Sequence, residues 1–230
     1  MKNIVKKLLR KNLDDIKYLH HGDEKVNIFA LIGGSESMKT LELIINELGS
    51  TNVLVITTAT TYKKDAEKKY LERFNNLGCN TDFIHASSSD EVDNKENLNK
   101  LKNADTIFFV GGDQSRISKC YLGTSFLDEM RNRVSEGVAL IGTSAGAMAM
   151  SQDMITGGDK VPTMGKGLSI IPNIIIDTHF KERNRESRLE LAVSYIPNKI
   201  GIGIPEDTAI VFKGNKVLTF GKGNIKVVKK

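Results

Sequence analysis

The sequence predicts an α/β fold, a single-domain three-layer sandwich built around a mostly parallel sheet. Apolar, β-rich segments alternate along the chain with segments of helical periodicity, which is the pattern of parallel strands joined by crossover helices. The runs ALIGG, FFVGG and ALIGTS are nearly continuous in apolar residues, as strands buried on both faces must be. After Ile200 the pattern changes to short strands with glycine turns, which predicts a closing C-terminal hairpin or meander.

Each element follows from its own local pattern. The apolar runs bounded by glycine or turn residues, and therefore predicted as strands, are 26–34, 52–59, 81–86, 106–112, 138–144 and 174–180. The segments in which apolar residues recur at helical spacing are 36–48, 63–77, 90–102, 126–136 and 181–195. No proline-, glycine- or serine-rich linker and no internal repeat interrupts this order. We therefore expect one domain over residues 25–230.

Residues 1–24 form a basic N-terminal arm. Apolar residues recur there at helical spacing, which predicts an amphipathic helix that packs on the body or on another subunit. Binding to a membrane surface is the alternative. The arm has neither an unbroken apolar stretch nor a small-residue cleavage site, so a secretion signal is not indicated and a cytoplasmic location is expected. A homodimer interface is the role that we expect for this arm.

Composition narrows the classes of function. The chain of 230 residues has a formal net charge of +5, but its lysines are scattered and only 6% of its residues are aromatic, so no nucleic-acid partner is expected. Cys79 and Cys120 lie far apart, and the sequence has no HExxH motif or His/Cys cluster with ligand spacing, so no metal is expected. Gly33 and Gly34 lack the third glycine of a dinucleotide-binding motif, so no cofactor is expected either.

A nucleophile elbow is the most specific motif. Residues 142–146 read Gly-Thr-Ser-Ala-Gly, which matches G-x-S-x-G between a buried strand and a small-residue helix. Such a turn would direct the Ser144 hydroxyl into the cleft, and the Ala145 amide would face a developing oxyanion. The glycines before Gln114 would allow Gly112 to supply a second amide. The alternative is a tight packing turn in which Ser144 only caps a helix.

A serine nucleophile needs a base and an acid. His179 follows a predicted strand on the same edge as Ser144, whereas His85, which also follows a strand, has no glycine turn or converging polar group beside it. Glu206 and Asp207 both follow the apolar run IGIGIP, so either is a candidate to orient the imidazole. The residues alone leave that choice open.

Three arginines follow the histidine. Arg185 and Arg188 are spaced i, i+3 on a predicted helix, and Arg183 lies near its start. Guanidinium groups beside a hydrolytic cleft suit carboxylates on a substrate, because they can form paired hydrogen bonds with them. The alternative is a solvated helix face on which the arginines pair with neighbouring glutamates.

Taken together, these motifs resemble the cyanophycinase family, whose members are related to the aspartyl dipeptidase called dipeptidase E. The resemblance runs from about residue 28 to residue 213, and its most specific segments are GGDQ at 111–114, GTSAGAMAM at 142–150, IIDTHFKERNRESRL at 175–189 and GIGIPEDTA at 201–209. It implies a sandwich similar to class I glutamine amidotransferases, which carry a cysteine where this chain has Ser144.

The resemblance also implies an activity and a set of site residues. The expected reaction is serine-type hydrolysis of cyanophycin, a poly-aspartate with arginine on each β-carboxyl, into β-Asp-Arg dipeptides. Ser144 would be the nucleophile, His179 the base and Glu206 the acid. The substrate-binding set would be Gln114, Asp177, Thr178, Arg183, Arg185 and Arg188, with Asp177 facing a substrate cation and the arginines facing aspartates.

Two features leave alternatives to this activity. Thr178 stands where cyanophycinases commonly have glutamine, and Pro205 stands where they commonly have aspartate. Because Thr178 lies in the binding segment, a related peptidase for short Asp-containing or isoaspartyl peptides is one alternative. Pro205 lies beside Glu206 and is expected only to reshape the turn there. A catalytically silent binding protein that retains the fold is another alternative.

Overall fold

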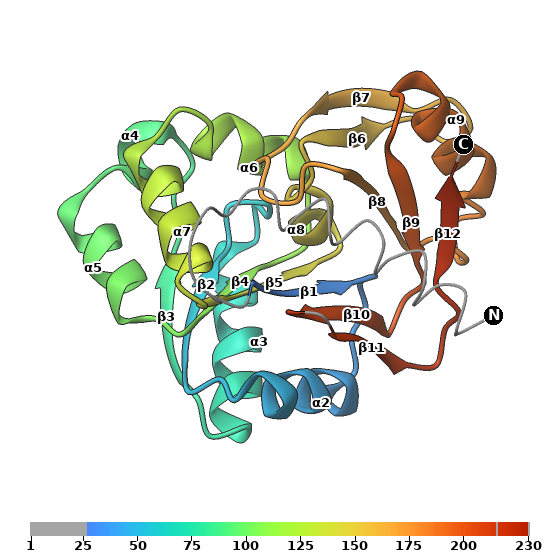
Figure 1. Ribbon diagram of the computed structural model, residues 1–230. Helices are drawn as coiled ribbons and strands as arrows, with labels where there is room; N and C mark the ends of the chain where they lie inside the picture. The colour runs from blue at the N-terminus through green and yellow to red at the C-terminus, as the bar shows by residue number, and fades with distance from the viewer. Residues whose placement is uncertain (1–26, 215, 230) are drawn as a thin grey trace.

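The computed structural model describes residues 27–214 and 216–229 (Figure 1). The apolar runs of the sequence form a seven-stranded sheet in the order β11-β10-β1-β5-β4-β2-β3. Its parallel strands are β1 (Ile28–Ile32), β5 (Ala139–Thr143), β4 (Thr106–Phe109), β2 (Asn52–Ile56) and β3 (Asn80–Ile84). An antiparallel hairpin of β10 (Thr208–Lys213) and β11 (Lys216–Gly221) extends the sheet beside β1. The predicted mostly parallel α/β sandwich with a closing hairpin is confirmed.

Helices cover both faces of this sheet. Figure 1 shows α2 (Met38–Leu48) and α3 (Lys63–Asn76) below the sheet, and α6 (Gln114–Tyr121) and α7 (Ser125–Ser135) above it. Side-chain caps explain where helices begin: the Ser37 hydroxyl accepts the Thr40 N–H at the start of α2, and the Thr124 hydroxyl accepts the Leu127 N–H at the start of α7.

A second, three-stranded sheet stands beside the first. In it β8 (Ile174–Thr178) pairs in parallel with β9 (Ile200–Ile204), and β12 (Lys226–Lys229) pairs antiparallel to β9. The last strand predicted from the alternating pattern, β8, therefore lies outside the main sheet. The short helix α8 (Ala145–Met148) contacts both β5 and β8, so it joins the two sheets. Helix α9 (Glu186–Tyr195) packs on the second sheet.

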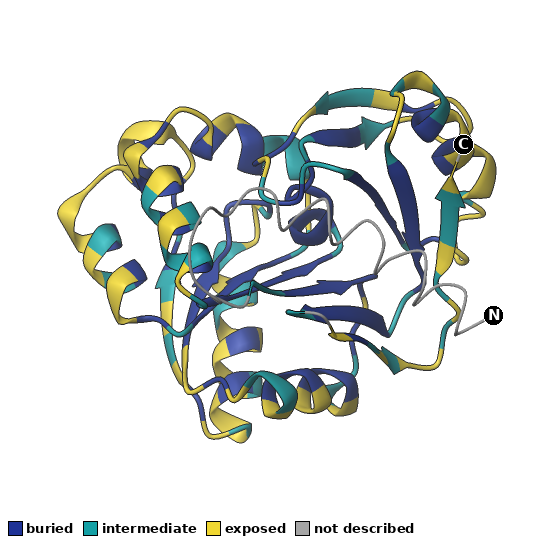
Figure 2. Ribbon diagram, viewed as in Figure 1, coloured by how far each residue is buried: buried dark blue, intermediate teal, exposed yellow. Residues whose placement is uncertain are grey.

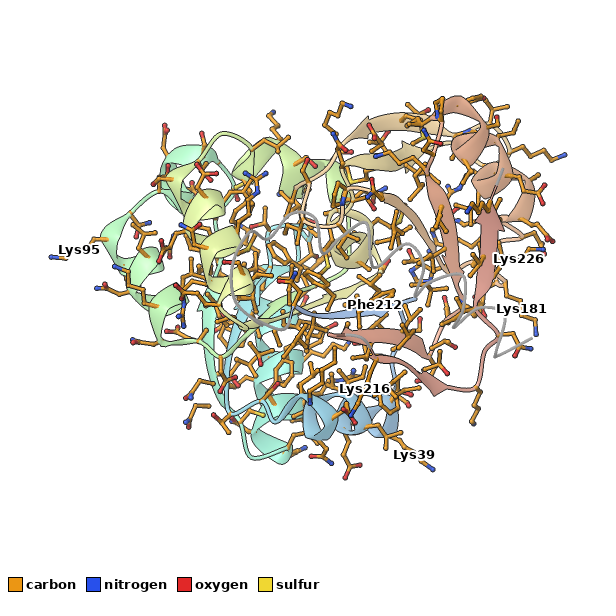
Figure 3. The ribbon with its side chains drawn as sticks, in the orientation of Figure 1. Lys39, Lys95, Lys181, Phe212, Lys216 and Lys226 are labelled. Atoms are coloured by element: carbon orange, nitrogen blue, oxygen red, sulfur yellow. The ribbon has the colours of Figure 1, made fainter. Side chains whose placement is uncertain are left out.

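Side-chain burial follows the layers. Figure 2 shows the central strands of the main sheet buried and the outer helix faces exposed. Every residue of β5 is buried, whereas the edge strands β3 and β11 are partly exposed. The labelled lysines of Figure 3, among them Lys39, Lys95 and Lys181, lie at the surface, whereas Phe212 on β10 is 2% exposed. The carboxyl ends of the central strands are therefore held by a rigid, close-packed interior.

Two predicted helices differ from the observed ones. The segment 90–102 is divided into α4 (Ser89–Val92) and α5 (Lys95–Asn103), because the Asp93 carboxylate accepts the Ser125 and Phe126 N–H groups at the start of α7. The segment 181–195 is helical only from Glu186, because residues 181–185 form a tight turn after β8.

Other elements were not predicted or fall outside the description. A hairpin of β6 (Asp153–Gly157) and β7 (Thr163–Lys166) was not anticipated from the sequence. The amphipathic helix expected over residues 1–24 lies outside the described residues. Within the described ranges, no helix has the length and apolar character needed to cross a membrane.

Candidate active site

Ser144 lies on a strained turn at the carboxyl end of β5. Its backbone has φ 51° and ψ −114°, a region that residues with a side chain rarely occupy. The Ser144 N–H donates to the Ile32 carbonyl on β1 at 2.9 Å, which holds the turn against the main sheet. The hydroxyl points away from that bond, toward the neighbouring sheet and His179. The geometry is that of a nucleophile elbow.

His179 reaches Ser144 from the second sheet. It follows β8 directly, with φ 49°, and its N–H donates to the Gly33 carbonyl at 2.9 Å. Its Nε2 lies 2.7 Å from Ser144 Oγ, and its side chain is 12% exposed. The imidazole is therefore largely shielded from water and held between the two sheets.

Glu206 completes the hydrogen-bonded chain. It follows β9, and its Oε1 lies 2.6 Å from His179 Nδ1. This hydrogen bond holds the pKa of Glu206 below its usual value, against the opposing effect of burial. In the tautomer that carries its proton on Nδ1, that N–H donates to Glu206 and Nε2 is an acceptor that faces the Ser144 hydroxyl.

Asp207 has a different contact. Its Oδ1 accepts the Ser37 N–H at 2.8 Å, at the start of α2. Burial alone would raise the pKa of Asp207, but hydrogen bonds from the Ser37 N–H and from the Thr40 and Ser37 side chains outweigh it and lower that pKa. Of the two adjacent carboxylates, Glu206 thus contacts the histidine and Asp207 anchors α2.

A pocket of about 270 Å³ opens on one side of Ser144 and His179. The three predicted arginines line it, together with Gln114 and Gly112. Gln114 begins α6, and its side-chain amide donates to the Ile155 carbonyl of β6 at 2.7 Å. The unpredicted β6–β7 hairpin therefore forms one wall of this pocket.

The three arginines are not equivalent. Arg188 is 3% exposed and binds both oxygens of Asp177, with its Nε 2.9 Å from Oδ2. Arg185 donates to Asp177 Oδ1 at 3.1 Å and to the Thr178 carbonyl at 2.7 Å. Arg183 is exposed, and no ion-pair partner for its guanidinium is found in residues 27–214 and 216–229. The predicted common helix face is wrong, since only Arg188 lies within α9.

Asp177 and Thr178 are placed differently from the expectation that both face a substrate. Asp177 is fully buried, so it reaches the pocket only through Arg185 and Arg188. Its burial raises its pKa, and the two arginines oppose that shift. Thr178 lines the pocket but is fully buried, and its hydroxyl contacts Met148 Sδ at 3.2 Å.

A second pocket, of about 340 Å³, also borders Ser144 and His179. It lies between the β1–α2 loop and the first turns of α3, and Tyr62 and Asp65 line it. Gly111 lines this pocket beside the nucleophile: a β-carbon built on it would lie 3.8 Å from Ser144 Oγ. Both pockets therefore border Ser144 and His179.

Glu36 was not singled out as a site residue by the sequence, although it belongs to this second pocket. It is 3% exposed, and its Oε2 accepts the Thr143 hydroxyl at 2.6 Å, one residue before Ser144. The signal in the sequence was an acidic residue in the segment Gly33-Gly34-Ser35-Glu36, which follows a predicted strand at the same sheet edge as the elbow.

Among the described residues, no group of three or more His, Cys, Asp or Glu side chains is arranged to hold an ion. The chemistry available in the described site is that of a hydroxyl, an imidazole and a carboxylate in a hydrogen-bonded line.

Comparison with known proteins identifies similar sequences. Residues 29–220 match the profile of peptidase family S51. The chain is 32% identical over 214 residues to a cyanophycinase of Geminocystis herdmanii, covering 86% of this chain and 79% of that protein. A cyanophycinase of Synechococcus elongatus is 31% identical over 233 residues, with 94% and 72% covered. A peptidase E of Nostoc sp. is 30% identical over 182 residues, with 74% and 71% covered.

Solved structures share the fold. A peptidase from an acI-B1 Actinobacterium superposes with a TM-score of 0.75 at 24% identity, covering 89% of this chain and 91% of that one. A putative peptidase E protein from Listeria monocytogenes gives a TM-score of 0.57 at 20% identity, with 86% and 100% covered.

Proposed function

The chain belongs to peptidase family S51 and is a serine-type peptidase, and on that premise we propose that it hydrolyses cyanophycin to β-Asp-Arg dipeptides with Ser144 as nucleophile. The observation that carries this proposal is the hydrogen-bonded line from Ser144 Oγ through His179 to Glu206, with distances of 2.7 and 2.6 Å. Both distances lie within the range required for proton transfer between a nucleophile, its base and an orienting acid.

In the proposed acylation step, Ser144 Oγ attacks the carbonyl carbon of the scissile peptide bond while His179 Nε2 takes its proton. Glu206 stabilises the imidazolium that forms, because its carboxylate accepts the Nδ1–H. The amides of Gly112 and Ala145 are the proposed donors to the oxyanion. Collapse of the tetrahedral intermediate breaks the C–N bond, and the imidazolium gives its proton to the leaving amine.

Deacylation repeats these steps with water. His179 removes a proton from the water molecule as it attacks the acyl-enzyme ester, and Ser144 leaves with that proton restored to its oxygen. The products are a carboxylic acid and an amine, and the enzyme returns to its starting state.

The two pockets support a division of the substrate. Arg183, Arg185 and Arg188 line the pocket that we assign to aspartyl carboxylates, since guanidinium groups bind carboxylates through paired hydrogen bonds. Asp177 orients two of these arginines in the proposed site rather than touching substrate. The second pocket is assigned to the leaving group.

Short Asp-containing or isoaspartyl peptides are the second candidate substrates. The peptidase E relative and the small side chain of Thr178, where cyanophycinases commonly carry glutamine, favour this candidate. Both candidates use the same nucleophile and differ in what the arginine-lined pocket must hold.

The test is incubation of the purified protein with cyanophycin and, separately, with short aspartyl and isoaspartyl peptides, with products identified by mass. Release of β-Asp-Arg from the polymer is expected. Ser144→Ala should lower the rate by about three or more decades, with an unchanged melting temperature and circular dichroism spectrum. Cleavage of the short peptides alone would favour the second candidate, and near-normal turnover by folded Ser144→Ala would contradict the mechanism.

A further inference from the structure

A buried carboxylate lies against the nucleophile elbow. Glu36, in the loop between β1 and α2, accepts the Thr143 hydroxyl on one oxygen at 2.6 Å. Its other oxygen accepts the Tyr70 hydroxyl at 2.9 Å and Arg73 Nη1 at 3.0 Å, both from α3. Lys69 Nζ lies 3.7 Å from that second oxygen. Glu36 therefore joins the end of β5 to helix α3.

Stability alone gives a weak reason for this arrangement. Removing a carboxylate from water is costly, and buried ion pairs often contribute no more to stability than apolar residues of the same volume. The hydrogen bond that distinguishes Glu36 from an ordinary buried pair is the one to Thr143. That residue directly precedes Ser144 in the chain and is itself 2% exposed.

The elbow needs such a restraint. Ser144 occupies a sparsely populated backbone region, and conformations of that kind persist only where the surroundings enforce them. On one side of the Thr143–Ser144 peptide, the Ser144 N–H is bonded to the Ile32 carbonyl. On the other, the Thr143 side chain is bonded to Glu36. The two bonds together restrain the peptide unit that sets the direction of Ser144 Oγ.

The same β1–α2 loop also supports His179 and the residue next to Glu206. The Gly33 carbonyl accepts the His179 N–H at 2.9 Å, and the Gly34 carbonyl accepts the Asp207 N–H at 2.9 Å, next to Glu206. A loop that carries Glu36 thus touches the nucleophile's strand, the base and the residue beside the acid. Anchoring this loop on α3 fixes the distances among them.

We propose that Glu36 is a positioning residue for Ser144 and acts through the hydroxyl of Thr143. The inference rests on the proposed function, since it takes Ser144 as the nucleophile. Glu36 does not transfer a proton in the reaction. It keeps the hydroxyl in line with His179, so its loss should slow acylation and leave substrate affinity nearly unchanged.

The experiment compares two pairs of variants. Glu36→Ala and Thr143→Val each remove the bond, whereas Glu36→Gln retains an acceptor and Thr143→Ser retains a donor. We expect the first pair to lower kcat by about 10- to 100-fold with KM changed less than about threefold. The conservative pair should recover most of that loss. The rate of labelling by a fluorophosphonate, which requires only the nucleophile and its base, should fall in parallel with kcat.

A stability control separates positioning from general damage. Asp105→Asn removes a carboxylate that accepts the Thr51 and Asn52 N–H groups at the opposite ends of the strands. It should lower the melting temperature while kcat and the labelling rate stay at wild-type values. The double variant Glu36→Ala/Thr143→Val should lose no more activity than Glu36→Ala alone, because Thr143→Val removes a bond that Glu36→Ala has already broken.

The outcomes distinguish a failure of the positioning role of Glu36 from a failure of the proposed function. If the wild type is not labelled at Ser144, the proposed function and the inference both fall. If the wild type is labelled but Glu36→Ala and Thr143→Val label at its rate, only the inference is overturned. Losses that add in the double variant, or a conservative pair as slow as the disruptive pair, would overturn it too. Should Glu36→Ala not fold, the Thr143→Val and Thr143→Ser comparison decides.

Discussion

Glu206 and Asp207 are adjacent in sequence but have separate surroundings. The Glu206 carboxylate lies 2.6 Å from His179 Nδ1, and the Asp207 carboxylate lies 2.8 Å from the Ser37 N–H. Asp207 has φ 47°, a left-handed conformation that turns the chain between the two side chains. One carboxylate is thus available to orient the base and the other to stabilise the start of a helix.

Kinetics on two variants tests this division. Glu206→Gln should lower kcat by about two to four decades with KM much less affected, because a neutral amide does not stabilise an imidazolium. Asp207→Asn should keep most of kcat and lower the melting temperature, because it weakens the cap of α2. Steady-state rates and thermal melts of both variants give the comparison. A large fall in kcat for Asp207→Asn with Glu206→Gln near wild type would reverse the assignment.

The β1–α2 loop is the element on which the site depends most closely. It contains Gly34, whose φ of 102° disfavours any side chain and whose α-carbon faces the imidazole of His179. A β-carbon at this position would collide with the ring. The loop therefore packs so closely against His179 that no side chain fits at position 34.

Gly34→Ala should displace His179 and remove most of the activity. The matched control is Gly49→Ala at the end of α2, where φ is 70° but the space around a β-carbon is open. Both variants should lose about 1 to 2 kcal/mol of stability to the left-handed conformation. Only Gly34→Ala should also lose kcat and fluorophosphonate labelling. Equal kinetics for the two variants, measured with their denaturation midpoints, would argue against the close fit.

At the level of the whole molecule, the site lies at the interface between two sheets. Ser144 comes from the seven-stranded sheet, whereas His179 and Glu206 follow β8 and β9 of the three-stranded sheet. Helix α8 contacts both sheets at this interface. Within the second sheet, buried Asp177 on β8 binds Arg188 on α9, which joins strand to helix behind the arginine-lined pocket.

Asp177→Ala should therefore act on the molecule as a whole. Removing the carboxylate leaves the buried guanidinium of Arg188 without its counter-ion, so we expect a loss of about 3 to 5 kcal/mol in the free energy of unfolding. The exposed Arg183 is the comparison: Arg183→Ala should raise KM for an aspartyl substrate with little change in stability. Urea denaturation and steady-state kinetics measure the two effects. A stable Asp177→Ala protein would contradict the structural role given to this carboxylate.

Much of the fold could be predicted because strands and helices leave local patterns. The continuous apolar runs at β1, β4 and β5 predicted buried parallel strands, and the glycine-rich segments after them marked the carboxyl edge. The elbow at Ser144 and the histidine at 179 were found by the same logic, because strand ends converge. Their catalytic roles, with that of Glu206, stay predictions for the variants above to test.

The tertiary structure decided what depends on contacts between distant residues. The alternating pattern does not state which sheet a strand joins, so β8 was not separated from the main sheet. Two local breaks prevailed over helical periodicity. In the turn at 181–185, Asn184 has φ 48° and the Arg185 N–H donates to the Phe180 carbonyl, so the helix begins only at Glu186. Between α4 and α5, the Asp93 carboxylate accepts N–H groups from the distant start of α7. Glu36 and Thr143 lie 107 residues apart. Only folding brings that carboxylate to the elbow, because the residues adjacent to Glu36 and to Thr143 in the sequence do not determine this long-range contact.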